Sequence, residues 1–376
     1  METLQKEVFA NSKNPLTLVI SPDRCRAYVA NAITNYDPKT ETVTNPISYY
    51  LIDTNTGKLI SYLKKDLELT LNFATTLVIH PAKPFLFVGA YDGNVAVLSI
   101  GGSGELSQLS VFNATGAGGH VQDMALDQTG TRLFVLTQLP DQTGSLKTYK
   151  LDTSSGSLTA FGTPLPVGQF PSALAVSPDN RFVVVSSGVV PGSLTSYEWN
   201  PEGGFPPSGT SYSAPLPTGA VSKILVRTRG QYIYVSYRYQ PGATTGIISG
   251  FALATDGKIA TLNGFNPQGY FQTCFSTVDG MTFDPSENRL YAIGQSSNQI
   301  VAYKISDQNG SLSQDGQPLP TGASPSGVAA AMDGDTVYVY VTNYGTNGQD
   351  GTSCLGSYSS PPPPPPAPPL PPAPGT

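Results

Sequence analysis

Histidine and cysteine, the side chains that most often bind metals or act as bases and nucleophiles, are scarce in this sequence. It has two histidines, His80 and His120, and three cysteines, Cys25, Cys274 and Cys354, with no Cys-x-x-Cys pair. A zinc site needs closely spaced ligands, so we expect no metal and no other cofactor. We expect the cysteines to be buried free thiols, with one disulfide among them as the alternative.

Positive charge, which an anionic ligand would require, is concentrated in one segment. Lys223, Arg227, Arg229 and Arg238 all lie between positions 223 and 238. Arg227 and Arg229 fall in a predicted turn, so we expect both of them to be exposed surface residues. A phosphorylated sugar acid would be held by several Arg or Lys side chains, and this segment offers few for such a site.

Few carboxylates stand where they could assist a base. Asp123 lies three residues after His120 and could orient its imidazole, but residues three apart in a regular strand point to opposite faces. Asp53 and Asp279 lie beside predicted turns, and we expect them to stabilise those turns.

These residues belong to a repeat in which a polar turn separates two apolar runs, as in SALAVSPDNRFVVVSS from Ser172. Each repeat continues with an alternating strand and, in most copies, a glycine turn such as SGSL at 155–158. A strand after that turn makes four strands per repeat, the size of one β-propeller blade. Copies recur about every 50 residues, anchored near Ser21, His80, Asp127, Ser177, Arg227, Asp284 and Met332.

The two ends of the chain indicate how the ring closes. The seventh repeat has a third strand near 351–358 and no fourth strand, whereas LQKEVF at 4–9 is a strand without a repeat. We therefore predict an all-β fold over residues 1–358, a seven-bladed propeller of four-stranded antiparallel blades closed by its N-terminal strand. Residues 359–376, with their proline run from Pro361, should form a polyproline II tail or linker.

Composition argues against several partner classes. Charged residues make up 12% of the chain, against about 25% in an ordinary globular protein, and the net charge is −6 without a basic cluster. Nucleic acid and anionic membranes are therefore poor partners, and no apolar run reaches the ~18 residues of a membrane span.

The compartment stays open on this evidence. The low charge favours an extracellular or cell-surface setting, but METLQKEVFANSK lacks the apolar segment of a signal peptide. The glycosylation triplets at Asn113 and Asn309 would matter only in a secreted chain.

Three motifs carry a resemblance to a known family: the repeated SPD-x-R hairpin, the strand ends YVSYRY and YVTN, and the glycine turn after each third strand. Over about residues 15–345 the sequence resembles the lactonase family of seven-bladed propellers. That family contains propeller-type 6-phosphogluconolactonases and fungal muconate-lactonizing enzymes. These motifs specify the architecture more than the activity.

The resemblance also implies candidate site residues. HVQDMALDQTG matches the family's functional blade, with His120 in the place of its first histidine and Gln122 in the place of its second. Arg238 of YVSYRY matches an arginine at a family strand end. The family's acidic positions are lost, since VLTQLP at 135–140 has no carboxylate and Ser186 and Ser187 replace an Asn-Glu pair.

Three functions remain open. The lost carboxylates favour a non-catalytic propeller that acts as a structural or interaction scaffold, tethered through its proline tail to a protein partner or to neighbouring copies. The alternative is a metal-independent lactone hydrolase of the 6-phosphogluconolactonase type, with His120 as the base and Arg238 binding the anionic end. The third is binding of a sugar lactone, glycan or other small molecule through the twenty tyrosines.

Overall fold

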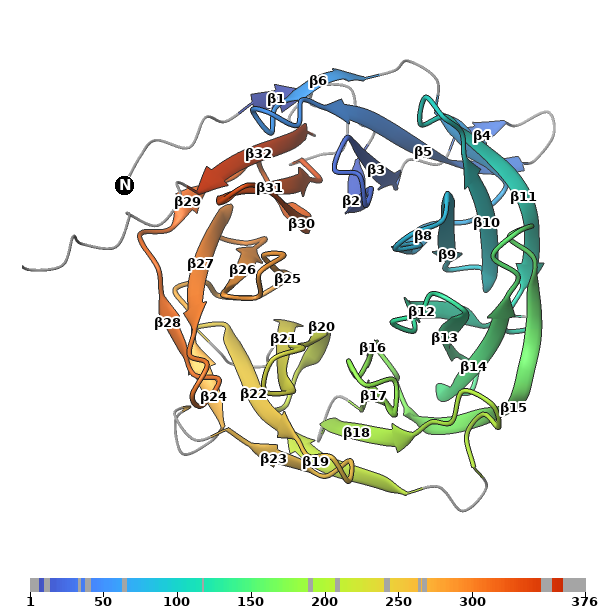
Figure 1. The fold of residues 1–376 in the computed structure, drawn as a ribbon, viewed down its shortest axis with the longest axis vertical. Helices are drawn as coiled ribbons and strands as arrows, with labels where there is room; N and C mark the ends of the chain where they lie inside the picture. Colours follow the sequence, from blue (N-terminus) through green and yellow to red (C-terminus); the bar gives the residue numbers. More distant parts are fainter. Residues whose placement is uncertain are drawn as a thin grey trace, which may run out of the picture.

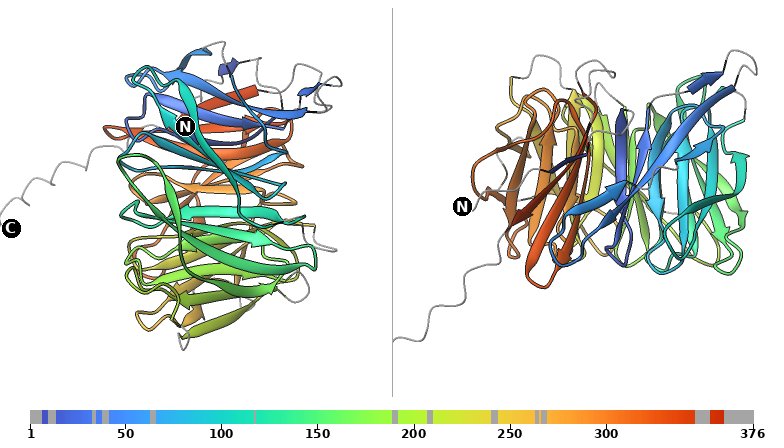
Figure 2. Two further views of the ribbon diagram at one scale, coloured as in Figure 1. Left: turned by 90° about the vertical axis from the view of Figure 1, so that its right-hand side faces the viewer. Right: turned by 90° about the horizontal axis from the view of Figure 1, so that it is seen from above.

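The computed structural model describes residues 7–9, 14–32, 35–37, 42–62, 66–116, 118–188, 192–206, 210–239, 244–262, 265, 269–345 and 354–360. Within these ranges the chain is all-β, and its strands form seven antiparallel sheets around a common centre (Figure 1). Views at right angles show the sheets side by side, as the blades of a disc (Figure 2). The predicted seven-bladed propeller is confirmed.

Each blade is described here from its innermost strand outward. The innermost strands are β2 (Pro15–Ile20), β8 (Ala74–Ile79), β12 (His120–Leu126), β16 (Ala173–Val176), β20 (Ala220–Val226), β25 (Gly280–Phe283) and β30 (Pro325–Asp333). The second strands are β3 (Arg26–Asn31), β9 (Phe85–Ala90), β13 (Arg132–Gln138), β17 (Phe182–Ser187), β21 (Tyr232–Tyr239), β26 (Arg289–Gly294) and β31 (Thr336–Asn343).

The two outer layers are less regular. The third strands are β5 (Thr42–Ile52), with β4 (Asn35–Asp37) paired to its start, β10 (Asn94–Ile100), β14 (Thr143–Leu151), β18 (Gly192–Glu198), β22 (Ile247–Leu253), β27 (Gln299–Ile305) and β32 (Cys354–Ser360). The outermost strands are β6 (Leu59–Tyr62) with β7 (Leu67–Leu69), β11 (Leu106–Asn113), β15 (Leu158–Gln169), β19 (Ser211–Leu216), β23 (Ile259–Thr261) with β24 (Tyr270–Gln272), β28 (Leu312–Gln314) with β29 (Leu319–Pro320), and β1 (Glu7–Phe9).

The N-terminal strand closes the ring, as predicted. β1 pairs antiparallel with β32, with Glu7 opposite Ser357 and Phe9 opposite Leu355. It therefore supplies the outermost strand of the seventh blade and covers an edge that would otherwise be unpaired. β32 ends at Ser360, and the predicted tail from Pro361 lies outside the described residues.

A hydroxyl joins the first and last blades near the channel as well. Ser326 Oγ donates a hydrogen bond of 2.6 Å to the carbonyl oxygen of Pro15. Thr75 and Ser222 are the equivalent residues of the second and fifth blades. Their hydroxyls donate to a carbonyl oxygen of the next blade, Val121 O at 2.8 Å and Val278 O at 2.7 Å. The seam that closes the ring is thus built like the other seams.

The polar turn between the innermost and second strands is closed by its anchor residue. In the fourth blade Ser177 N donates to Phe182 O at 2.8 Å, and Ser177 Oγ accepts from Phe182 N at 2.9 Å. Asp127 and Arg132 repeat this arrangement in the third blade, at 3.0 and 2.9 Å. The anchor side chain is buried in each of the first six blades, at Ser21, His80, Asp127, Ser177, Arg227 and Asp284.

The apolar core is divided into seven clusters, one in each seam between neighbouring blades. In the seam between the third and fourth blades, the rings of Phe134 and Trp199 meet edge to face, 4.9 Å apart. Because each apolar cluster joins two neighbouring blades, a further blade adds one more cluster and does not enlarge a single core.

The two cysteines whose side chains are described do not lie in the core, which contradicts our expectation of buried thiols. Both are free; Cys25 is partly exposed and Cys274 is exposed. The reason is their position, since Cys25 lies in the turn after β2 and Cys274 in the loop between β24 and β25. The side chain of Cys354 lies outside the described residues.

Candidate functional site

The start of each innermost strand and the end of its antiparallel second strand meet at one end of the ring, which we call the channel mouth. His120 lies there as the first residue of β12, in the third blade, and Arg238 lies there near the end of β21, in the fifth. No hydrogen bond or ion pair joins the two among the described residues. The fold therefore brings the two predicted site residues to the same end, on different blades.

Solvent reaches the centre of the ring. Every residue of the second strands β9 and β17 is buried, whereas the innermost strands β12 and β20 mix buried and partly exposed positions. Second strands are covered by neighbouring strands on both sides, while innermost strands have an edge that faces the channel. We therefore assign the partly exposed positions of β12 and β20 to this edge.

His120 is held by the neighbouring second blade. Its Nδ1 is hydrogen bonded to the carbonyl oxygen of Tyr91, and its ring stacks on the Tyr91 ring with centroids 3.7 Å apart. A carbonyl oxygen can only accept, so Nδ1 carries the proton and Nε2 keeps the lone pair in the neutral ring. Nε2 is therefore the nitrogen that could take a proton from water.

A β-bulge changes the direction of the side chains after His120. The register of β12 shifts between Val121 and Asp123, which makes Gln122 the extra residue. As a result Val121 and Met124 lie in the same core cluster although they are three positions apart. The expectation about the directions of Asp123 and His120 assumed a regular strand, and the strand is not regular between them.

Asp123 nevertheless does not serve His120, because other groups occupy its carboxylate. Oδ1 accepts from Thr76 Oγ1 at 3.1 Å and from Met124 N at 2.9 Å. Oδ2 accepts from Leu174 N at 3.1 Å and lies 3.6 Å from Lys223 Nζ. The side chain is buried and connects four consecutive blades.

Asp279, just before β25, is a second carboxylate at the channel mouth. Its Oδ2 accepts from Thr277 Oγ1 at 2.6 Å and from Gln295 N at 2.8 Å, the turn role that we expected. Burial raises the pKa of Asp279, while these two hydrogen bonds and the nearby charge of Arg238 act in the opposite direction. Asp279 and Arg238 are thus electrostatically coupled across the seam between the fifth and sixth blades.

The predicted exposure of Arg227 is wrong. Its side chain is fully buried, its Nε donates to Glu287 O at 2.8 Å, and Nη2 pairs with Asp307. Arg227 occupies the anchor position of its turn, where the chain places an interior side chain in each of the first six blades. Arg229 is half exposed, as predicted, and pairs with Asp307 at 3.8 Å. Both arginines lie at the end of the ring opposite the channel mouth.

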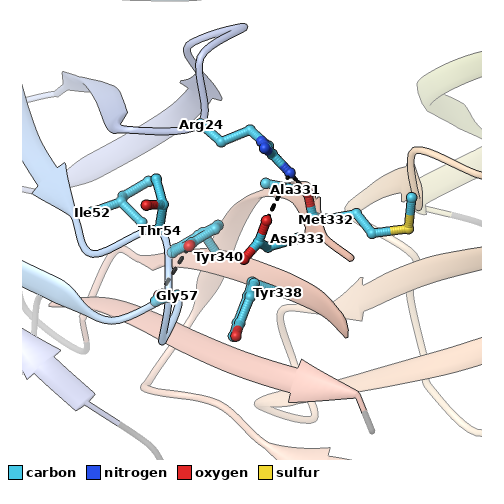
Figure 3. A pocket seen from close by; sticks show the side chains of 9 residues that line it. All are labelled: Arg24, Ile52, Thr54, Gly57, Ala331, Met332, Asp333, Tyr338 and Tyr340. Carbon is cyan, nitrogen blue, oxygen red and sulfur yellow. Dashed lines mark hydrogen bonds and ion pairs between the residues drawn. The ribbon is translucent and has the colours of Figure 1, made fainter. Parts of the chain in front are cut away.

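A small pocket lies at that opposite end, between the last and first blades (Figure 3). Arg24 reaches from the first blade, donates to Met332 O and lies 3.3 Å from Asp333 Oδ1. Tyr340 Oη donates to Gly57 O at 2.9 Å across the same seam. The pocket is therefore part of the contact that closes the ring.

Metal and membrane sites were sought over the described ranges. They contain no group of three or more His, Cys, Asp or Glu side chains placed to hold a metal ion. They also contain no helix long and apolar enough to cross a bilayer.

Comparison with known structures supports the fold. The chain is similar to a protein from Bacteroides fragilis described as a candidate 6-phosphogluconolactonase, with 16% identity over 84% of this chain and 86% of that one and a TM-score of 0.65. The periplasmic gluconolactonase of Pseudomonas aeruginosa is similar with 17% identity over 83% of this chain and 87% of that one and a TM-score of 0.61. Sqt1 of Chaetomium thermophilum, solved with the N-terminus of ribosomal protein L10, is similar with 15% identity over 93% of this chain and 89% of that one and a TM-score of 0.56. At these identities the likeness extends to the fold alone.

Sequence comparison identifies the family. A search of curated proteins gave no significant match. The family model described as "Lactonase, 7-bladed beta-propeller" matches residues 132–266, 190–325 and 271–352, overlapping segments that together cover more than half of the chain. The chain belongs to the lactonase family of seven-bladed β-propellers.

Proposed function

We propose that this chain is a non-catalytic member of the lactonase family that acts as an interaction scaffold. The observation that carries the proposal is the state of Asp123, the carboxylate nearest in sequence to His120. Both of its oxygens are taken up by Thr76, Met124, Leu174 and Lys223. Among the described residues, His120 has a backbone carbonyl as its hydrogen-bond partner and no carboxylate to stabilise an imidazolium.

An assay of lactone hydrolysis tests this proposal. The purified chain is mixed with glucono-δ-lactone and with 6-phosphogluconolactone, and acid release is followed with a pH indicator. We expect the rate of spontaneous hydrolysis in buffer, unchanged by His120→Ala. Hydrolysis well above that rate, abolished by His120→Ala, would overturn the proposal.

The proline run from Pro361 is the part of the scaffold that we propose as a tether. Its composition favours an extended polyproline II rod, which aromatic-lined grooves of partner proteins bind. Deleting residues 361–376 removes no described strand, so the melting temperature should stay unchanged while self-association or partner binding is lost. Light scattering and thermal unfolding measure the two effects, and a large fall in melting temperature would mean that the segment packs on the ring.

A lactone hydrolase is the second candidate, supported by the bond of His120 Nδ1 to Tyr91 O, which leaves Nε2 as the nitrogen that could accept a proton. In this reaction Nε2 would take a proton from water as the water oxygen attacks the lactone carbonyl, and the ring C–O bond would then break. The departing alkoxide would recover that proton, and Arg238 would hold the anionic end of the substrate. Loss of activity in His120→Ala, with a raised KM in Arg238→Ala, would support this candidate.

A further inference from the structure

Three exposed aromatic side chains lie at the channel mouth on the second and fourth blades, which flank the blade of His120. Phe73, Tyr91 and Phe170 are 44%, 50% and 42% exposed. The other large apolar side chains exposed in the described ranges, Ile60 and Leu109, lie on the outermost strands β6 and β11. Exposed aromatics grouped in one place indicate a binding surface, whereas scattered ones do not.

The three aromatics belong to one connected structure across the second, third and fourth blades. Tyr91 N donates to Phe73 O at 2.8 Å, and the Tyr91 ring stacks on His120. His120 lies opposite Gln138 in the β12–β13 pair. We call the connected set the aromatic–amide rim; it consists of Phe73, Tyr91, His120, Gln122, Gln138, Gln142 and Phe170.

Glutamine amides connect the other half of the rim. Gln122 Nε2 donates to Gln138 Oε1 at 2.8 Å, and Gln138 Nε2 donates to Gln142 Oε1. Phe170 N donates to Gln142 O at 2.9 Å, which joins the fourth blade to this chain of amides. All three amides are at least partly exposed, so each keeps donor and acceptor capacity for a ligand.

The backbone gives independent evidence that the fold does not require aromatic side chains at Phe73 and Phe170. Phe73 and Phe170 have φ of 54° and 51°, a left-handed conformation that is unfavourable for a bulky side chain. Asn14 and Ser324 hold the same position and conformation in the first and seventh blades, with φ of 53° and 52°. Four blades therefore share this conformation, and two of them adopt it without an aromatic side chain.

We propose that the aromatic–amide rim binds a neutral saccharide. The flat rings of Phe73, Tyr91 and Phe170 would pack on the apolar C–H faces of pyranose units, and the glutamine amides would exchange hydrogen bonds with sugar hydroxyls. The rim contains no Lys, Arg, Asp or Glu. Two carboxylates flank it, Asp92 and Asp141, so the local charge disfavours an anionic sugar.

Isothermal titration calorimetry with cellohexaose and maltohexaose tests this binding site, with gluconate as the anionic probe. We expect at least one oligosaccharide to bind and gluconate not to bind. Tyr91→Ala, Phe73→Gly and Phe170→Gly should each weaken binding about tenfold or more. Because glycine adopts positive φ freely, the two glycine variants should keep or raise the melting temperature while they lose affinity.

Asn14→Gly and Ser324→Gly are the matched controls, since they change the same backbone position in blades without the aromatic. They should leave affinity unchanged. The proposal is overturned if neither oligosaccharide binds, if gluconate alone binds, or if affinity is the same in Tyr91→Ala as in the unmodified chain. These outcomes are independent of lactone hydrolysis and of the proline tail.

Discussion

Asp123 and Lys223 form an ion pair between blades that are not neighbours, with Oδ2 of the carboxylate 3.6 Å from Nζ of the ammonium. Asp123 lies on β12 in the third blade and Lys223 on β20 in the fifth. The fourth blade contributes Leu174 N to the same carboxylate oxygen. A propeller is otherwise held together by contacts between adjacent blades, whereas this pair links two blades that have a third between them.

The two partners should differ in their effect on stability. Asp123→Ala should lower the free energy of unfolding by about 3 kcal/mol, because it leaves buried donors such as Leu174 N without an acceptor. Lys223→Met should cost only about 1 kcal/mol, because the carboxylate keeps its other hydrogen bonds and the lysine is partly exposed. Urea unfolding measures both variants. A larger loss in Lys223→Met than in Asp123→Ala would contradict this account.

Truncation of the two arginines in one turn should destabilise the fold to very different extents. Arg227→Ala removes a fully buried side chain that bonds Glu287 O and Asp307, and should cost about 3 kcal/mol. Arg229→Ala, the control, removes a half-exposed partner of Asp307 and should cost no more than about 0.5 kcal/mol. Denaturant midpoints compare the two, and equal losses would show that burial of Arg227 does not matter.

The raised pKa of Asp279 makes a prediction about pH. Since the folded-state pKa lies above the ordinary aspartate value of 3.8, the contribution of Asp279 to stability is complete below that pH and is lost as pH rises through the folded pKa. Asp279→Asn cannot ionise and can still accept from Thr277 and Gln295. Its melting temperature should match that of the unmodified chain at about pH 3 and exceed it at neutral pH.

Asp152 is the control with the opposite sign. Hydrogen bonds from Ser154 and Ser155 lower its pKa to about 2, so its contribution is present above the unfolded pKa and is lost as pH falls. Asp152→Asn should therefore melt below the unmodified chain at neutral pH, with the gap closing as pH falls towards 2. Thermal unfolding across this range measures both variants, and gaps of the same sign would contradict the assignment.

Two glycines separate backbone strain from steric clash. Gly57 has φ of +65°, and a Cβ there would lie 1.9 Å from Cδ1 of Tyr338 in the seventh blade. Gly334 has φ of +53° and open space around it. Gly334→Ala should cost about 1 kcal/mol through backbone strain alone, and Gly57→Ala about 2–4 kcal/mol because the ring-closing seam must also shift. Equal losses, measured by urea unfolding, would mean that Tyr338 moves freely.

The repeat made the architecture readable from the sequence. Alternation of apolar and polar residues predicts strands, positive-φ glycines such as Gly156 predict the turns, and the unmatched strand at the N-terminus predicts closure through β1. These signals are local and occur many times, so an error in one copy is corrected by the others. The resemblance to the lactonase family, and not these local signals, pointed to His120 and Arg238, and the fold brings both to the channel mouth.

Properties that depend on contacts between blades could not be read in this way. A bulge at Gln122 reverses the alternation and directs Asp123 towards its neighbours, and Arg227 is buried because the next blade covers its turn. Phe73, His120 and Phe170 lie far apart in the sequence, on three successive blades, and are connected only in the folded chain. Sequence alone determined which strands form and in what order, because strand formation follows from local side-chain patterns. Only the tertiary structure decided which polar groups are buried, paired or left facing the channel, because that depends on how seven separate sheets pack.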